Sequence, residues 1–340
     1  MRGCEMTVKE ARTIAEQYHR KPNPSDEDFF IFTEAMDFLI REQYNPRDMM
    51  HLGGVYYERR EFDLALKYYE MASTFNIDAA DECLGYIWYY GRTGERDYEK
   101  AFKHYSRSME RGNYVSTYKV ADMYRNGYYV EKNLDKYKEI IEKLYEELKG
   151  YLDPDAPIPE VWTRLARIRK DEGKMEDAAN LYLQAKDVLA ERLKWSDFFG
   201  DINIMKWLID DLYEIIEFDP EYVDLFDLFY VLKRPANVTF YYGDEKHTVE
   251  SLIEDGVCVV RFDDKWYRDR DEFFKKARLD DLKLTSIHDY LYGFEVNLLC
   301  GGKRKWISLI LITPTILGTR NFCCGENSFA KKRTLIMVFM

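Results

Sequence analysis

The chain has 340 residues, of which 46% are hydrophobic and 33% are charged, and its formal net charge at pH 7 is −12. The length suggests two domains, and the acidic balance argues against a general nucleic-acid binder, which needs a basic face. Residues 1–20 lack the apolar core of a secretory signal, and no apolar run reaches the eighteen or so residues that cross a bilayer. The six cysteines show no metal-ligand spacing. We therefore expect a cytoplasmic protein without a membrane span.

The first segment, residues 1–46, is predicted to contribute leading helices. Residues 10–19 and 29–42 carry apolar side chains at helical spacing, with Phe32, Met36 and Leu39 on one face of the second helix. We expect these two segments to open a stack of helices.

From 47 to 234 the chain repeats one template, and this repetition is its most informative feature. Each copy has a branched apolar residue followed by a small one, then a break and a second helix that opens near an alanine. The copies begin at Leu52, Leu84, Val120 and Leu165. The second-helix position follows 13 residues later in the first and fourth copies, at 65 and 178, and 17 residues later in the middle two, at 101 and 137.

Simple physical reasons support the repeat. Small residues at 53, 85, 121 and 166 let the second helix approach the first closely. Glycines at 91, 94 and 127 can adopt positive φ where the chain reverses, and Gly112 is placed to end a helix. A single helix pair cannot bury its apolar face, so neighbouring pairs must stack. The sequence predicts a mainly α fold, an α-solenoid of stacked antiparallel helix pairs.

The second copy also matches a known motif at a set of fixed positions: Ala80, Leu84, Gly85, Gly91, Asp97, Lys100 and Ala101. It departs from that motif at Thr93 and Gly94, and the third copy keeps Tyr124, Gly127 and Val130. In these residues the chain resembles the Sel-one-like (SLR) repeat family, a relative of the tetratricopeptide repeat, over roughly residues 47–190. The resemblance implies a protein–protein adaptor without a cofactor, whose partner sits on the concave face lined by the first helix of each pair.

After an extended, proline-rich connector at 153–159, a fourth repeat and further helices at 204–217 and 222–232 are predicted. Residues 235–297 then change character and predict a small α+β module. We expect a strand at 237–242, a short helix at 248–255, a strand at 257–262 and a helix capped by Asp269 that runs to Ala277.

The last segment, 298–340, has an anomalous composition. It holds one of the 62 acidic residues and none of the 28 tyrosines, but seven basic residues and three of the six cysteines. Two hypotheses compete for it. One is a basic tail that touches a membrane surface or an acidic partner. The other is an end that is out of frame, chimeric or disordered.

No catalytic centre, metal site or cofactor site is predicted. His247 and Cys258 could form a nucleophilic pair, but no flanking motif supports it. The acidic residues at 263, 264, 269 and 271 lack the spacing of a calcium loop, and Gly301-Gly302-Lys303 lacks the context of a phosphate loop. We therefore expect no enzyme. The alternatives are an enzyme or effector whose activity resides in 235–297, and a purely structural spacer.

A partner-binding stripe is predicted on the first helices, at positions next to those that pack inward. It consists of Arg47, Met50, Tyr57, Glu82, Tyr86, Tyr89, Tyr118, Asp122, Arg125, Arg167 and Lys170, with Thr163 at its edge. Tyrosine and arginine are the residues most often found where interfaces gain their energy. The hypothesis is a groove with an aromatic centre and one cationic end that receives a peptide or a helix. The competing interpretation is that Tyr86, Tyr89 and Tyr118 only pack between helices. The sequence gives no sign of the oligomeric state.

Overall fold

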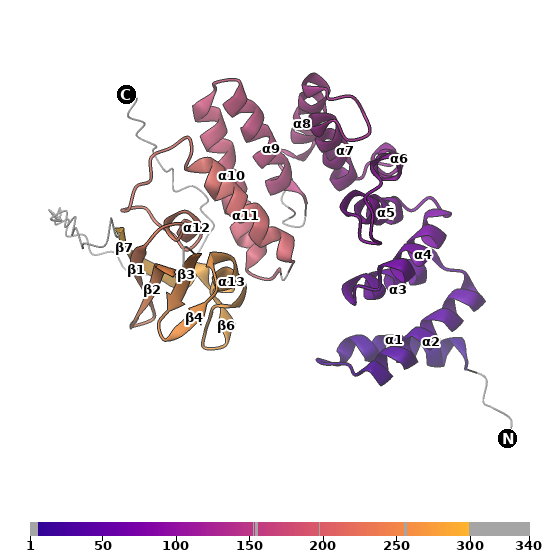
Figure 1. Ribbon diagram of the computed structural model, residues 1–340. Helices are drawn as coiled ribbons and strands as arrows, with labels where there is room; N and C mark the ends of the chain where they lie inside the picture. The colour runs from indigo at the N-terminus through magenta and orange to yellow at the C-terminus, as the bar shows by residue number, and fades with distance from the viewer. Residues whose placement is uncertain (1–5, 152, 154–155, 197, 255–256, 299–340) are drawn as a thin grey trace, which may run out of the picture.

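A computed structural model describes residues 6–151, 153, 156–196, 198–254 and 257–298. Helices form a curved stack, and a small β-sheet follows at the end far from the N-terminus (Figure 1). The main helices are α1 (Val8–Arg20), α2 (Asp26–Gln43), α3 (Pro46–Glu58), α4 (Phe62–Ser73), α5 (Asp78–Tyr90), α6 (Tyr98–Glu110), α7 (Tyr114–Asn126), α8 (Leu134–Leu148), α9 (Ile158–Asp171), α10 (Met175–Leu193) and α11 (Phe199–Leu212). The predicted solenoid of antiparallel helix pairs is confirmed.

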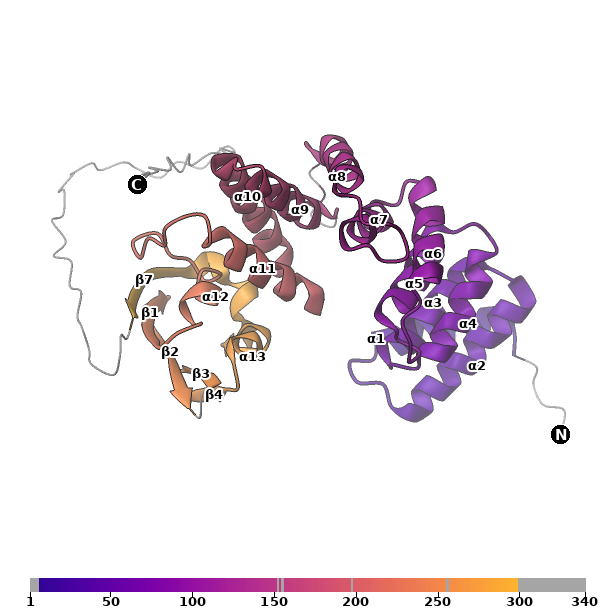
Figure 2. The same ribbon diagram turned by 45° about the horizontal axis from the view of Figure 1, so that its top comes forward.

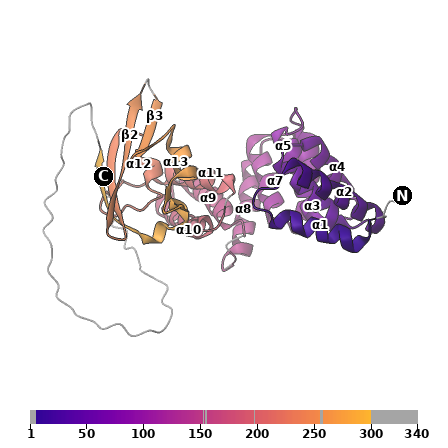
Figure 3. The same ribbon diagram turned by 90° about the horizontal axis from the view of Figure 1, so that it is seen from below.

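The first helices of the pairs line the inside of the curve. In Figures 1 and 2, α3 and α5 face the concave side, whereas α4 and α6 lie on the outside. Seen from below in Figure 3, α7 and α8 lie between the N-terminal helices and the half that carries the sheet. Residues on α3, α5 and α7 therefore share one side of the molecule.

Close contact within two of the helix pairs, α3–α4 and α5–α6, depends on a glycine that faces an aromatic ring. A Cβ atom at Gly85 would lie 2.6 Å from the ring of Tyr105 on α6, and one at Gly53 would lie 2.8 Å from Tyr69 on α4. Such distances are below van der Waals contact, so only glycine allows these rings to lie against the partner helix. The predicted role of the small residues at 53 and 85 is confirmed.

The loops also follow the prediction. Gly91 and Gly127 cap α5 and α7 with φ of 65° and 71°, the left-handed region that glycine adopts readily. Asp97 and Asn133 then accept hydrogen bonds from backbone N–H groups in the first turns of α6 and α8. The longer loops of the middle two repeats are thus fixed at both ends.

The C-terminal segment forms an antiparallel sheet with short helices beside it. Its elements are β1 (Ala236–Tyr242), β2 (Glu245–Glu254), β3 (Val257–Phe262), β4 (Lys265–Tyr267), β7 (Leu291–Leu298), α12 (Leu228–Val231), α13 (Arg270–Lys276), the short pair β5 (Arg278–Leu279) and β6 (Leu282–Lys283), and the 3-10 turns η1 (Leu284–Ser286) and η2 (His288–Tyr290). The strand order is β4-β3-β2-β1-β7. The small α+β module is confirmed, as are its strands at 237–242 and 257–262 and the helix capped by Asp269.

Three sequence expectations were wrong in detail. The predicted helix at 248–255 is part of strand β2, because Val249 and Ser251 alternate with outward residues and pair with β1 and β3 on either side. The helix expected at 204–217 begins at 199 and ends at 212. Of the helix expected at 222–232 only the single turn of α12 forms. The rest of that segment forms turns, in which backbone N–H groups such as those of Leu228 and Phe229 donate to carbonyls three residues earlier.

One hydrophobic core runs from Tyr118 through α9, α10 and α11 into the sheet as far as Leu291. The module therefore shares its core with the end of the solenoid. A separate core holds α1 to α5 together, and a small one lies between α6 and α7. Among the described residues, no helix is long and apolar enough to cross a membrane. The anomalous tail, 298–340, lies outside the described residues except for Leu298, the last residue of β7.

Acidification should weaken the contact between α1 and α3. His19 and His51 meet there through their Nε2 atoms, with Asp48 and Arg12 beside them. Burial and the neighbouring His19 lower the pKa of His51. The folded protein then binds fewer protons than the unfolded chain, so stability present above pH 6.5 is lost as the pH falls. We expect the melting temperature to fall between pH 7.5 and 5.5, and the fall to be about 2 °C smaller in His51→Gln. Circular dichroism melts at both pH values would measure it; equal falls in the two proteins would contradict the assignment.

Candidate functional site

Tyrosine rings from neighbouring repeats meet on the concave side. The ring of Tyr57 on α3 lies 6.1 Å from that of Tyr86 on α5, and Tyr86 lies 4.4 Å from Tyr90, centroid to centroid. Tyr89 and Tyr90 are 4.9 Å apart. We call Tyr57, Tyr86, Tyr89 and Tyr90 the tyrosine cluster. Burial of the Tyr57 hydroxyl and its closeness to Tyr86 raise the pKa of Tyr57 to about 12, so Tyr57 is uncharged at neutral pH.

Two cations lie over this cluster. The Lys119 ammonium of α7 is 5.2 Å from the ring centre of Tyr90 and donates a 3.0 Å hydrogen bond to its hydroxyl. The Arg92 guanidinium lies 5.5 Å from the ring centre of Tyr86. Such positions give an attractive cation–π interaction. Neither Lys119 nor Arg92 forms an ion pair with a carboxylate of the described residues, although Lys119 interacts electrostatically with Glu82.

Arg92 also borders a surface cleft of about 440 Å³ between two inter-helix loops. The cleft is lined by residues 60–64, from the α3–α4 loop and the first turn of α4, and by residues 92–94, which follow α5. Its walls contain Arg60 and Arg92 together with Glu61 and Asp63. The cleft and the tyrosine cluster therefore share one cation, Arg92.

Three residues of the predicted stripe are used to pack helices together. Tyr118 is buried, and the guanidinium of Arg164 lies 4.2 Å from its ring centre. Asp122 accepts two hydrogen bonds from the same arginine, at 2.9 and 2.6 Å. Glu82 accepts a 2.8 Å hydrogen bond from Asn113. The packing interpretation fits these three residues better than an open groove.

The expected cationic end of the stripe is neutralised. Arg167 donates a 2.6 Å hydrogen bond to Asp211, and Lys170 pairs with Glu214, both on or just after α11. Because these acids come from the next helix, no helical-wheel argument within one repeat could reveal them. Lys119 and Arg92, which form no ion pair with a described carboxylate, lie beside Tyr86 and Tyr90 instead.

The other residues of the stripe are Arg47, Met50 and Arg125. Arg47 is exposed at the start of α3, Met50 packs partly against the N-terminal core, and Arg125 lies 5.7 Å from the ring centre of Tyr137. The structure thus brings Tyr57, Tyr86 and Tyr89 together and leaves the outer members of the stripe apart. Sequence reasoning missed Tyr90, Arg92 and Lys119; the spacing of Tyr86 and Tyr90 by four helical positions was the available signal for one of them.

The residues of the module that were considered for catalysis or calcium binding do not form a common site in the described part of the chain. Cys258 on β3 pairs with Ile253 on β2. Ile253 lies six residues along β2 from His247, so Cys258 and His247 are separated by about 20 Å. Instead, the Nδ1 atom of His247 lies 2.8 Å from a carboxylate oxygen of Asp263. Asp269 caps α13, and Asp271 pairs with Lys206. The glycine-lysine sequence at 301–303 lies outside the described residues.

The chain was compared with known proteins. No protein-family model matches it, and no curated protein does. Similar solved structures include a Sel1 repeat protein from Oxalobacter formigenes, with 20% identity, a TM-score of 0.44, and coverage of 61% of this chain and 79% of that one. Another is a protective antigen of uropathogenic Escherichia coli with an SLR fold, at 18% identity and a TM-score of 0.42, with 62% of this chain and 49% of that one covered. A third is a type IV pilus biogenesis factor, at 11% identity and a TM-score of 0.39, with 61% and 90% covered.

The repeat itself is recognised from its internal contacts. Two successive helix pairs join through Gly53 against Tyr69 and Gly85 against Tyr105, and the loops after α5 and α7 carry the additional residues seen in the sequence. The chain is therefore a helical-repeat protein built of stacked antiparallel helix pairs. Solenoids of this kind present an extended concave surface.

Proposed function

We propose that this repeat protein is an adaptor that binds an extended peptide or a helix of a partner protein on its concave face. The tyrosine cluster, with Lys119 and Arg92 above it, is the centre of the binding surface. The observation that carries the proposal is the pair of cations over aromatic rings that form no ion pair with a carboxylate of the described residues. Of the other cations on the first helices, Arg164, Arg167 and Lys170 each have a carboxylate partner, whereas Arg47 and Arg125 form no ion pair with a described residue.

The chemistry of the cluster favours a partner segment with both acidic and apolar side chains. A carboxylate of the partner can pair with Lys119 and Arg92, while its apolar groups can cover the tyrosine rings. Tyrosine offers a large rigid ring at low entropic cost and a hydroxyl for hydrogen bonds. In a chain of net charge −12, a local positive centre also directs an acidic segment to this one place.

A peptide display library panned against the full chain tests the proposal. We expect the selected peptides to be enriched in Asp and Glu next to aromatic or aliphatic residues. The dissociation constant of a selected peptide, measured by fluorescence polarisation, should rise about tenfold or more in Tyr86→Ala and in Lys119→Glu, because residues at the centre of an interface typically contribute above about 1 kcal/mol.

The matched control is Lys67→Glu, which makes the same charge reversal on the outer helix α4. Lys67 is exposed and lies over the ring of Tyr68, so it resembles Lys119 in chemistry but not in place. We expect its dissociation constant to stay within about twofold of the wild type, as for a charge remote from an interface. Peptides that bind Tyr86→Ala, Lys119→Glu and wild type equally would show that the partner binds elsewhere.

A further inference from the structure

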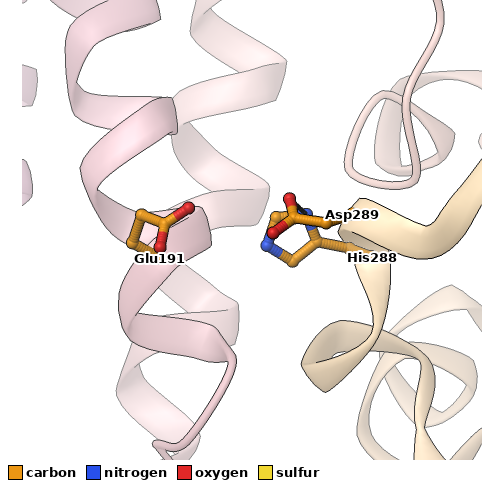
Figure 4. A group of neighbouring side chains, drawn as sticks. All are labelled: Glu191, His288 and Asp289. Atoms are coloured by element: carbon orange, nitrogen blue, oxygen red, sulfur yellow. Dashed lines mark ion pairs between the residues drawn. The ribbon is translucent and has the colours of Figure 1, made fainter. Parts of the chain in front are cut away.

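Three side chains of the kinds that bind metal ions meet where the solenoid touches the C-terminal module. Glu191 comes from the last turn of α10, and His288 and Asp289 come from η2. Their ligand atoms all lie within 4.8 Å of one another. Figure 4 shows His288 and Asp289 reaching from the C-terminal segment toward Glu191 on α10.

The orientation of the His288 ring defines which nitrogen is available. Its Nε2 atom lies 3.1 Å from the carbonyl oxygen of Ala190, which can only accept, so Nε2 carries a hydrogen. The edge of the ring packs against Phe226, 5.0 Å between centroids. The ring is therefore held in place. Metal-binding histidines commonly donate their other N–H to a backbone carbonyl in this way.

The opposite nitrogen needs a positive charge in front of it. Nδ1 of His288 lies 3.1 Å from a carboxylate oxygen of Asp289. With Nε2 protonated, a neutral imidazole presents a lone pair at Nδ1, and a lone pair facing a carboxylate oxygen is repulsive. A metal ion between the two atoms removes that repulsion.

The side chain of Lys194 already forms ion pairs with both carboxylates, those of Glu191 and Asp289. The Lys194 ammonium lies 2.7 Å from Glu191 and 2.5 Å from Asp289. Its side chain is 30% exposed, whereas those of Glu191 and Asp289 are more than half exposed. Lys194 can therefore swing into solvent, and the carboxylates can close on an ion that replaces its ammonium.

We propose that Glu191, Asp289 and Nδ1 of His288 form a binding site for a divalent transition-metal ion, with Lys194 as the competing cation. One imidazole nitrogen and two carboxylate oxygens suit Mn²⁺, Fe²⁺ or Zn²⁺. Bonds of about 2.0–2.2 Å at tetrahedral angles place ligand atoms about 3.4 Å apart, so the exposed Glu191 side chain has to move toward His288 and Asp289 to complete the site. A bound ion joins α10 to the module. The inference does not depend on the proposed partner-binding function.

Titration of the full chain with Mn²⁺, followed by the loss of the free-ion EPR signal, tests this site. Mn²⁺ is chosen because it prefers oxygen and imidazole ligands over the thiols of the six cysteines. We expect one equivalent to bind, and the affinity to fall about tenfold or more in Glu191→Gln and in His288→Gln. Circular dichroism of each variant confirms that it is folded.

Replacing Lys194, the competing cation, gives a second test of the site. Lys194→Gln should bind Mn²⁺ about tenfold more tightly than wild type, since one positive charge leaves the site. Lys174→Gln, which removes a lysine paired with Glu172 near the start of the same helix, should leave the affinity unchanged. No binding by wild type and Lys194→Gln, or equal binding by all variants, would overturn the proposal. So would a loss of binding in His51→Gln, because the ion would then lie at the His19–His51 contact.

Discussion

Replacing Lys186 with methionine should lower the free energy of unfolding by about 3–5 kcal/mol, the range found when one partner of a buried ion pair is removed. The Lys186 ammonium, on α10, lies 2.6 Å from Asp227 and 2.8 Å from Asp224. The side chains of Lys186 and Asp227 are 3% and 2% exposed. Burial opposes the charge of Lys186, but the two carboxylates outweigh it and raise its pKa. Without the ammonium, Asp227 becomes an unpaired buried carboxylate.

Urea unfolding followed by circular dichroism measures this loss, and a double variant separates its cause. Lys186→Met with Asp227→Leu removes both charges, so we expect it to recover at least half of the loss, because a well-packed apolar pair can replace a buried ion pair. Lys174→Met removes an exposed lysine from an ion pair with Glu172, and its effect should stay within about 0.5 kcal/mol. A double variant as unstable as Lys186→Met would mean that lost packing, and not the buried charge, causes the effect.

Truncating Tyr105 to alanine should cost about 3–5 kcal/mol, the usual cost of removing a large buried aromatic side chain. The Tyr105 ring is 1% exposed and fills the space against Gly85 between α5 and α6. Because glycine leaves no side chain at that position, nothing in the facing helix can fill the cavity. We expect the loss to appear in urea unfolding as a lower midpoint with an unchanged slope.

Tyr105→Phe is the matched control for this cavity. The Tyr105 hydroxyl is buried and has no hydrogen-bond partner among the described residues. Removing the hydroxyl while keeping the ring should therefore leave the stability unchanged or raise it by up to about 1 kcal/mol. A loss in Tyr105→Phe comparable to that of the alanine variant would show that the hydroxyl, and not the ring, stabilises the helix pair.

The repeats were predictable because their signals are local. Gly85 and Gly91 in the second copy and Gly127 in the third mark a close contact and two chain reversals, and each conformation depends on residues within one repeat. The strand at 245–254 was predicted as a helix from 248 onward because its apolar positions alone are ambiguous. Pairing with β1 and β3 decides its conformation, and that pairing joins residues distant in sequence.

The proposed binding surface was only partly predictable. Tyr57, Tyr86 and Tyr89 were predicted from their position on the first helices, and their rings meet one another through Tyr86 and Tyr90. The sequence could not show that Asp122 forms an ion pair with Arg164, or that Arg167 forms one with Asp211, because each partner lies on another helix. It also gave no reason to select Lys119, which approaches Tyr90 from the next repeat.

The sequence by itself determined the helix pairs, their caps and the glycine contacts, since helical periodicity and glycine geometry act over a few residues. Only the tertiary structure decided which charges are neutralised. Lys186 meets Asp227, and Glu191 meets His288 and Asp289, across 41 or more positions of the chain. Charges act through space with a strength set by distance and burial, and the stacking of the repeats fixes both.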